Sequence, residues 1–216
     1  MLDKKYKVIM FDLDGTSLNT DLYCVMNHAH MFLKYAPERL PSLSELVYFS
    51  GPSLEETFSK YLGEFDFKEL KKEYVDWSKD HTISLSSVYN GEREVLDNIV
   101  SHGYKLGIVT NRDQETSEEL LEAFDLAKYF DVVYGREKCE ASKPDPRGLL
   151  KAIEEMKVNK DEVIYIGDSN IDISTARNAG VDSILVTWSL KKDLDKTLSN
   201  YNVSSYEEIE RMFIDE

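Results

Sequence analysis

Cysteine is scarce in this sequence, and its two cysteines, Cys24 and Cys139, lie too far apart to form a metal-binding or redox motif. This scarcity excludes a disulfide-stapled scaffold and predicts two reduced, unpaired thiols. Long hydrophobic runs are also absent, because no apolar stretch approaches the roughly 18 residues that a bilayer span needs. Residues 1–7 lack the hydrophobic region of a signal peptide. We therefore expect a cytoplasmic protein that does not enter a membrane.

Positively charged residues are also scarce relative to acidic ones. The 26 lysines and arginines stand against 41 aspartates and glutamates, which gives a net charge of −15. A chain with this balance repels nucleic acid and anionic membrane surfaces, so neither is expected as a partner. A phosphorylated small molecule is repelled at long range as well, so any anion site needs local cations or a metal. The sequence leaves the oligomeric state open between monomer and homodimer.

What the chain does contain is enough apolar sequence for a large core, with 42% hydrophobic residues among 216. Five short apolar runs are typical of buried strands, at residues 7–11, 105–109, 131–134, 162–166 and 183–187. Helical patterns separate most of them, at residues 92–102, at 114–124 and from Pro146 onward, with Asp145 as the N-cap. This alternation predicts an α/β fold with a doubly wound, parallel, Rossmann-like sheet.

One long segment breaks the alternation. Between residues 18 and 87 there is no convincing strand, only three apolar stripes at helical spacing. We expect a small helical bundle here, inserted after the first strand as a cap domain over residues 17–87. The core domain then comprises residues 1–16 and 88–216. The small polar residues 84–87 suit a hinge between the two.

The motif Asp12-Leu13-Asp14-Gly15-Thr16 follows the first apolar run directly. Residues two apart in an extended chain point the same way, so the carboxylates of Asp12 and Asp14 should converge. Such a pair can hold a divalent cation or divide the roles of nucleophile and acid/base. Two turn aspartates capping a strand would have the same sequence.

Two further motifs provide polar or positive groups at expected strand or helix ends, where ligands bind in open α/β sheets. Thr110 and Asn111 end the second strand and can hold an oxyanion or phosphate, or merely cap the next helix. Lys143 lies between Ser142 and Pro144 in a stiff segment, where a fixed ammonium can hold a phosphate. A solvated surface lysine is the alternative for Lys143.

The fourth motif, Gly167-Asp168-Ser169-Asn170-Ile171-Asp172, follows another buried strand. Asp168 has little structural reason to stand there, whereas Asp172 in a first helical turn can simply compensate the helix dipole. Both carboxylates can also complete an oxygen shell for Mg²⁺.

Together, in this order, the four motifs resemble the signature motifs of the haloacid dehalogenase-like hydrolase superfamily over nearly the whole chain. The position of the helical insert resembles the helical-cap class of that superfamily. Tyr89-Asn90-Gly91 and the segment Gly51-Pro52-Ser53-Leu54-Glu55-Glu56 look most similar to phosphoglycolate phosphatase and pyrophosphatase relatives. Ser17 and Ser189 depart from the usual pattern of relatives, but neither departure touches a chemical group.

The resemblance implies that Asp12 attacks phosphorus and forms an aspartyl-phosphate, while Asp14 acts as general acid and base. It implies Mg²⁺ held by Asp12, by the backbone carbonyl of Asp14 and by Asp168, with Asp172 acting indirectly. Lys143 then serves catalysis and, with Thr110 and Asn111, binds the transferring phosphoryl group.

The expected function is therefore a Mg²⁺-dependent phosphohydrolase of a small phosphorylated metabolite. Inorganic pyrophosphatase and sugar-phosphate mutase are alternatives on the same fold, and a catalytically silent binding module is the non-enzyme alternative. Gly51, Pro52 and Ser53 form a candidate recognition loop, or an ordinary turn between helices. Arg112 stands beside the phosphate site, where it could touch the substrate, but it is expected to be an exposed, salt-bridging arginine. His28 is expected to be a structural or solvated residue.

Overall fold

The computed structural model describes residues 5–214 and contains a six-stranded parallel sheet in the order β3-β2-β1-β4-β5-β6. The strands are β1 (Val8–Phe11), β2 (Lys105–Val109), β3 (Val132–Tyr134), β4 (Val163–Gly167), β5 (Asp182–Val186) and β6 (Tyr201–Val203). The expected doubly wound α/β fold is confirmed. The outermost strand, β6, was not expected, because it is three residues long with a polar Asn202 at its centre.

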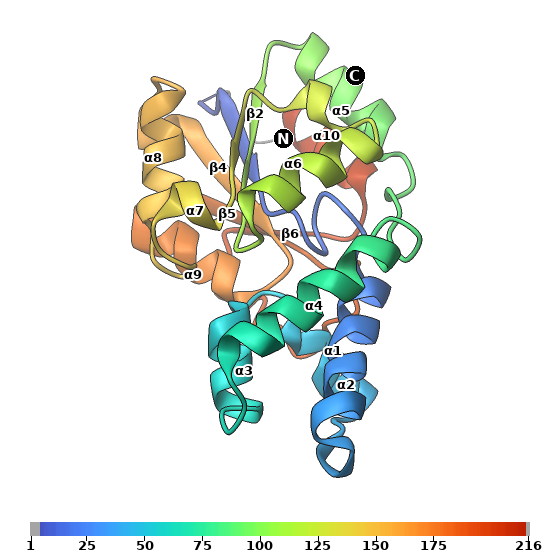
Figure 1. Cartoon of the computed structure of the whole chain (residues 1–216). Helices are drawn as coiled ribbons and strands as arrows, with labels where there is room; N and C mark the ends of the chain where they lie inside the picture. Colours follow the sequence, from blue (N-terminus) through green and yellow to red (C-terminus); the bar gives the residue numbers. More distant parts are fainter. Residues whose placement is uncertain (1–4, 215–216) are drawn as a thin grey trace.

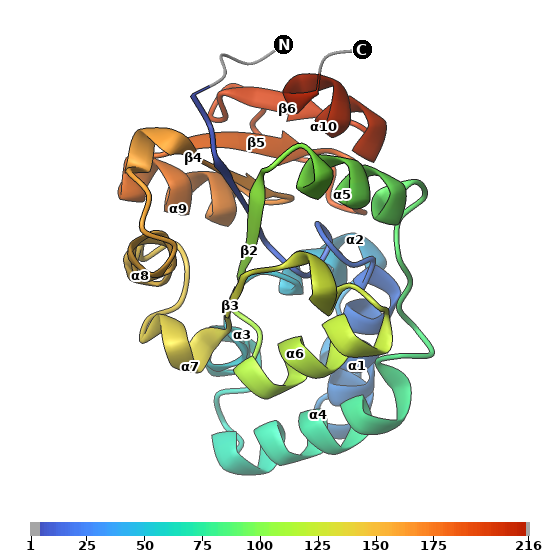
Figure 2. The same ribbon diagram turned by 90° about the horizontal axis from the view of Figure 1, so that it is seen from above.

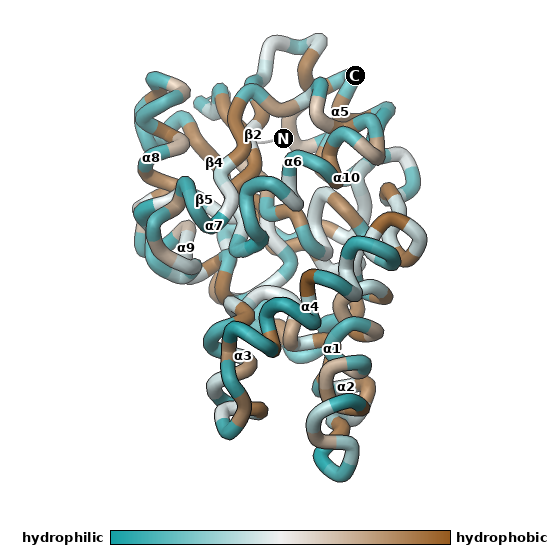
Figure 3. The backbone as a smooth tube through the Cα atoms, in the orientation of Figure 1, coloured by the Kyte–Doolittle hydropathy of each residue, from teal (hydrophilic) through white to brown (hydrophobic). Residues whose placement is uncertain are grey.

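Helices cover both faces of the sheet (Figures 1 and 2). Alternate residues of β1 point to opposite faces, so Ile9 and Phe11 join one hydrophobic cluster while Val8 and Met10 join another. The first cluster packs under α5 (Glu92–Ser101), α6 (Gln114–Ala123) and α10 (Tyr206–Phe213). The second packs under α7 (Arg136–Cys139), α8 (Arg147–Glu155) and α9 (Asn170–Ala179). Burial on both sides explains why the central strands are apolar without alternation; Figure 3 shows hydrophobic segments along them.

Element boundaries differ from the sequence expectations by a residue or two. The helix expected from Pro146 begins at Arg147, although Asp145 Oδ1 still accepts a hydrogen bond from the Arg147 amide at 2.9 Å. Short 3₁₀ turns connect several elements, at Pro37–Arg39, Val47–Phe49, Ala127–Tyr129 and Lys160–Glu162. Within the described residues, no helix combines the length and apolar character of a membrane span.

Four helices gather at one end of the sheet (Figure 1). They are α1 (Asp21–Tyr35), α2 (Leu43–Leu46), α3 (Leu54–Tyr61) and α4 (Phe67–His81). These helices share a hydrophobic cluster of their own around Phe32, Phe49 and Phe58. The two chain segments that lead into and out of them pair, with Asn19 and Ser87 exchanging backbone hydrogen bonds of 2.9 and 3.0 Å. The chain therefore enters and leaves the helical group at one narrow, hydrogen-bonded crossing.

Candidate active site

The polar residues singled out in the sequence meet at the carboxyl edge of the sheet. Asp12 follows β1, Thr110 follows β2 and Asp168 follows β4. Because β2, β1 and β4 are adjacent and parallel, their ends bring these three side chains to one edge. All three are buried. The convergence expected from the order of the motifs is therefore present.

Three carboxylates form a compact cluster at this edge. Asp12, Asp168 and Asp172 each place one oxygen within 4.8 Å of the others, and all three are buried. Asp172 is held by a capping box at the start of α9, where its Oδ2 accepts a hydrogen bond of 2.5 Å from the Ser169 hydroxyl. Asp172 therefore both caps the start of α9, through Oδ2, and belongs to the carboxylate cluster.

Lys143 lies against two of these carboxylates and is only 4% exposed, so the alternative of a solvated lysine is wrong. Its Nζ is 2.6 Å from Asp172 Oδ1 and 2.7 Å from Asp12 Oδ1, and it donates to the Tyr165 hydroxyl at 3.1 Å. Burial by itself lowers the pKa of Lys143, but the two carboxylates raise it well above the ordinary value. Lys143 is therefore a permanently charged group inside the site.

The carboxylates respond unequally to burial. Burial raises the pKa of Asp12 to about 7, against the opposing effect of Lys143 and with the help of the neighbouring acids. The pKa of Asp172 is lowered instead, because Lys143 and the Ser169 hydroxyl outweigh its burial. Asp12 is thus the member of this pair whose charge is least compensated by the protein.

The cluster fits a hard divalent cation. Asp12 Oδ1 faces Lys143 without hydrogen-bond geometry, so this buried oxygen has no hydrogen-bond partner among the described residues. Glycine at position 15 allows Asp168 to approach the loop after β1, because a Cβ added to Gly15 would lie 2.2 Å from Asp168 Oδ2. The three buried side chains offer only oxygen ligands, the type that Mg²⁺ prefers.

Lys191 carries no motif that singles it out in the sequence. This residue follows β5, is 3% exposed, and donates from Nζ to both oxygens of Asp168 at 2.9 and 2.6 Å. In the sequence it stands beside Lys192 and resembles an ordinary surface pair. Burial raises the pKa of Asp168, and Lys191 opposes that shift without cancelling it.

Asp14 points away from the three-carboxylate cluster to a different cation. Arg112 donates to both of its oxygens, from Nε at 3.0 Å and from Nη2 at 2.7 Å, and the Thr20 hydroxyl donates at 2.7 Å. Burial raises the pKa of Asp14, but Arg112 outweighs it and the net shift is downward. The expectation of an exposed Arg112 is wrong, because its side chain is 11% exposed and its guanidinium lies 5.2 Å from the ring of Tyr23 on α1.

Thr110 and Asn111 have separate positions. Thr110 is buried and lines the cavity described below. The Asn111 side chain does not cap the next helix, whose N-cap is Asp113. It donates to the Gly51 carbonyl at 2.7 Å and accepts from the Lys143 amide at 2.7 Å. Asn111 therefore ties the loop between α2 and α3 to the loop that carries Lys143.

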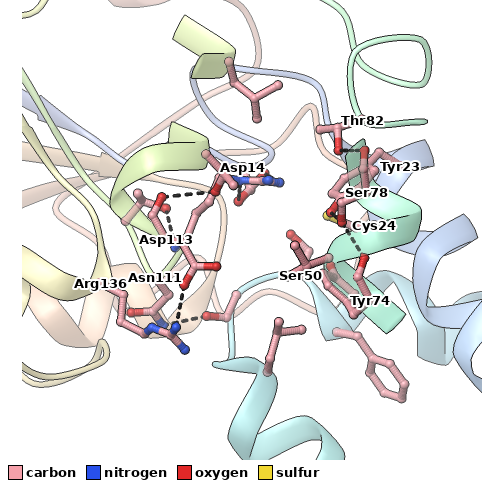
Figure 4. Close-up of a pocket in the computed structure, with 18 of the residues that line it drawn as sticks. Asp14, Tyr23, Cys24, Ser50, Tyr74, Ser78, Thr82, Asn111, Asp113 and Arg136 are labelled. Carbon is pink, nitrogen blue, oxygen red and sulfur yellow. Dashed lines mark hydrogen bonds and ion pairs between the residues drawn. The ribbon is translucent and has the colours of Figure 1, made fainter. Parts of the chain in front are cut away.

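A cavity of about 420 Å³ lies between the sheet edge and the helical group. Figure 4 shows its two walls, with Asp14 and Asn111 on one side and Tyr23, Ser50 and Tyr74 on the other. Gly51 and Pro52 of the candidate recognition loop line it, whereas Ser53 is not among the lining residues. Ser53 instead caps α3, because its hydroxyl accepts from the Glu56 amide at 3.3 Å.

His28 is a buried residue of the helical group and also borders the cavity. Its Nδ1 lies 2.7 Å from the Cys24 carbonyl, which makes Nδ1 the protonated nitrogen. Burial lowers the pKa of His28 to about 4, so the ring is neutral at physiological pH. Cys24 and Cys139 are both free thiols, as expected.

Comparisons with known proteins agree with this geometry. The family model described as haloacid dehalogenase-like hydrolase matches residues 9–186. Pyrophosphatase PpaX from Bacillus cereus is 34% identical over 187 residues, which cover 87% of this chain and 86% of that protein. A predicted phosphatase from Clostridium acetobutylicum superposes with a TM-score of 0.83 at 28% identity, covering 95% of this chain and 97% of the other. A predicted phosphoglycolate phosphatase from Haemophilus somnus shares the fold at 20% identity, with a TM-score of 0.83 over 96% of this chain and 98% of the other.

Proposed function

The chain belongs to the haloacid dehalogenase-like hydrolase family, and we propose that it is a Mg²⁺-dependent phosphohydrolase working through a phosphorylated Asp12. One observation carries this proposal. The Asp12 carboxylate lies beside Lys143 and within a buried oxygen cluster, next to a cavity large enough for a small phosphorylated molecule. A catalytically silent binding module would not need this concentration of buried, mutually compensating charge.

The proposed metal ligands are the carboxylates of Asp12 and Asp168 and the backbone carbonyl of Asp14, with Asp172 acting indirectly through Lys143. A bound Mg²⁺ would neutralise phosphoryl oxygens and so make phosphorus accessible to an anionic nucleophile. Lys143 contributes a second, fixed positive charge on the same side.

In the proposed first step, an Asp12 oxygen forms a bond to phosphorus while the bond from phosphorus to the leaving oxygen breaks. The Thr110 hydroxyl and the backbone amide of Asn111 donate to the transferring phosphoryl group. In the second step, water attacks phosphorus, the Asp12 carboxylate is released, and inorganic phosphate forms. Asp14 donates a proton to the leaving oxygen and later accepts one from the attacking water; this role requires that substrate binding draw Arg112 away, because the ion pair holds the pKa of Asp14 low.

We propose that residues 17–87 act as a cap on the core formed by residues 1–16 and 88–216, of which 1–4 and 215–216 lie outside the described residues. Two observations support this division. The helical group has its own hydrophobic cluster, and it joins the sheet at the paired crossing of Asn19 and Ser87. The link from Asn111 to Gly51 then holds the cap over the cavity, which excludes water from the reaction.

The substrate that fits best carries a second anionic group near the phosphate that is cleaved. Arg112 lines the cavity, and its bonds to Asp14 use only two of its five N–H donors. Pyrophosphate and phosphoglycolate both have such a group, and the similarity to a pyrophosphatase favours the former. A sugar-phosphate mutase is less well supported. Such mutases usually carry an arginine after the glycine of the cap loop, and residues 51–61 of this chain contain none.

The two unpaired thiols suit a reducing compartment, so we propose that the protein is cytoplasmic.

The test is the substitution Asp12→Asn, assayed for phosphate release from pyrophosphate, phosphoglycolate and p-nitrophenyl phosphate with Mg²⁺. We expect a loss of activity of at least about 10³-fold, since an amide cannot act as the nucleophile. The unsubstituted protein, quenched in acid during turnover, should carry phosphate that hydroxylamine releases. Asp113→Asn, at the rim of the same cavity, is the matched control and should stay active.

Activity that survives Asp12→Asn would contradict the assignment of the nucleophile. A wild-type protein that releases no phosphate from any of these substrates, with Mg²⁺ present, would favour the binding-module interpretation instead.

A further inference from the structure

Lys191 is a buried ion that the proposed reaction does not use. Its ammonium donates to both oxygens of Asp168, one of the proposed metal ligands, and the two residues are 3% and 1% exposed. A lysine is rarely buried to this extent unless it neutralises something. The burial of Lys191 is therefore explained by its ion pair with Asp168.

The position of Lys191 is fixed by its neighbours in the chain. The Leu190 amide donates to Asp21 Oδ2 at 2.9 Å, and the amides of Lys192 and Asp193 donate to the Tyr48 hydroxyl at 3.1 and 2.8 Å. Both acceptors belong to the helical group, so the loop is clamped on either side of Lys191. Lys191 is consequently held against Asp168 and is not a surface side chain that folded inward.

Charge explains what the contact does. Lys143 compensates Asp12 and Asp172, which leaves Asp168 as the member of the cluster that Lys143 does not contact. Lys191 supplies the missing counter-charge at hydrogen-bond distance. Three buried carboxylates beside two ammonium groups then carry a net charge of about −1, whereas about −2 would remain without Lys191, which a protein interior tolerates less well.

The same contact is unfavourable for a second cation. By bonding to both oxygens, the ammonium takes the side of the carboxylate on which a cation is attracted most strongly. A divalent ion on either oxygen would lie within a few ångströms of the ammonium, where like charges repel strongly. We propose that Lys191 is a built-in counter-ion of Asp168 that competes with the divalent metal for this carboxylate. This inference rests on the proposed metal site and adds that the site is tuned for weaker, exchangeable binding.

The experiment compares metal affinity with the stability of metal-depleted protein in Lys191→Met. We expect Mg²⁺ and Mn²⁺, titrated by calorimetry, to bind at least about tenfold more tightly, since one repelling charge is removed. We expect the melting temperature without metal to fall by about 6–15 °C, because Asp168 is left buried without a counter-ion. Added Mg²⁺ should raise the melting temperature of the variant more than that of the wild type.

Lys191→Gln keeps a hydrogen-bond donor without the charge and serves if the methionine variant does not fold. Lys191→Arg keeps the charge and should retain wild-type affinity, and Lys192→Met, exposed and adjacent, should change neither quantity. Equal or weaker metal binding by both uncharged variants would overturn the competition and leave Lys191 as a residue that merely orients Asp168. A wild-type protein that binds neither metal would overturn the metal site itself, which separates the two failures.

Discussion

Two regions of this molecule bury carboxyl groups, and they do so in opposite ways. At the carboxyl edge of the sheet, Asp172 lies 2.6 Å from the Lys143 ammonium, and its pKa is held below the ordinary value. At the start of α5, Glu92 is fully buried, and among the described residues no cation lies at hydrogen-bond distance from it. Burial there raises the pKa of Glu92 to about 8.

The hydrogen-bond count around Glu92 supports a neutral acid. The Tyr206 hydroxyl lies 3.0 Å from the Thr16 carbonyl and 3.0 Å from Glu92 Oε1, yet it has only one proton. If the hydroxyl donates to the carbonyl, a protonated Glu92 can donate to the Tyr206 oxygen and satisfy every group. The comparison teaches that burial without a counter-charge favours the neutral acid at Glu92. At the candidate active site the Lys143 ammonium and the Ser169 hydroxyl outweigh burial at Asp172 and keep it charged.

The largest test of this contrast removes the cation from the site. Lys143→Met should lower phosphate release by about 10³-fold, because a fixed charge that stabilises the transition state is lost. It should also lower the free energy of unfolding by about 3–5 kcal/mol, since Asp12 and Asp172 remain buried without their partner. Steady-state kinetics and urea unfolding measure the two effects.

Lys151→Met is the matched control, because Lys151 pairs with Glu140 on the surface of α8. We expect less than about 1 kcal/mol from that change. A Lys143→Met protein with wild-type activity would show that the buried charge serves folding alone.

A smaller effect is expected from Arg112→Met, which separates the substrates. The guanidinium is proposed to hold a second anionic group, so kcat/KM should fall about 10–100-fold more for pyrophosphate than for p-nitrophenyl phosphate, as for a lost charge-assisted hydrogen bond. Loss of the ion pair with Asp14 affects both substrates, and this shared effect cancels in the ratio of their kcat/KM values. Competition assays in one reaction mixture give this ratio directly.

Arg136→Met provides the comparison, since Arg136 also lines the cavity but pairs with Asp113. It should affect both substrates alike. An unchanged ratio in Arg112→Met would leave Arg112 as a partner of Asp14 only.

Part of the candidate active site was predictable from the sequence. Asp12, Thr110 and Asp168 were identifiable because each directly follows an apolar strand, and parallel strands bring their ends together. That is a local signal combined with a general rule of topology. The α/β fold itself was predictable from the same alternation of strands and helices.

The partners of these residues were not predictable in this way. Lys191 reaches Asp168 across 23 positions, through a loop clamped by the helical group, and no local pattern encodes such a contact. The burial of Arg112 similarly depends on Tyr23, which is far away in the chain. Ser53 is different, because the spacing of Ser53 and Glu56 is a capping-box signature that was present in the sequence.

The smallest effect on activity is expected from Glu92→Gln, which tests the other side of the comparison through stability. The folded pKa of Glu92, about 8, lies above the unfolded value near 4.5, so the folded state binds the proton more tightly. Its stabilising contribution is complete below about pH 4.5, declines by up to about 1.4 kcal/mol per pH unit between pH 4.5 and 8, and is lost above pH 8. Glutamine cannot ionise, so the variant should lack this decline and gain stability relative to wild type as the pH rises from 4.5 to 8. Urea unfolding from pH 6 to 9 measures the slope, with the exposed Glu94→Gln on the same helix as control. An identical pH slope in Glu92→Gln and wild type would mean that Glu92 stays charged when buried, and the contrast with the active site would then fail.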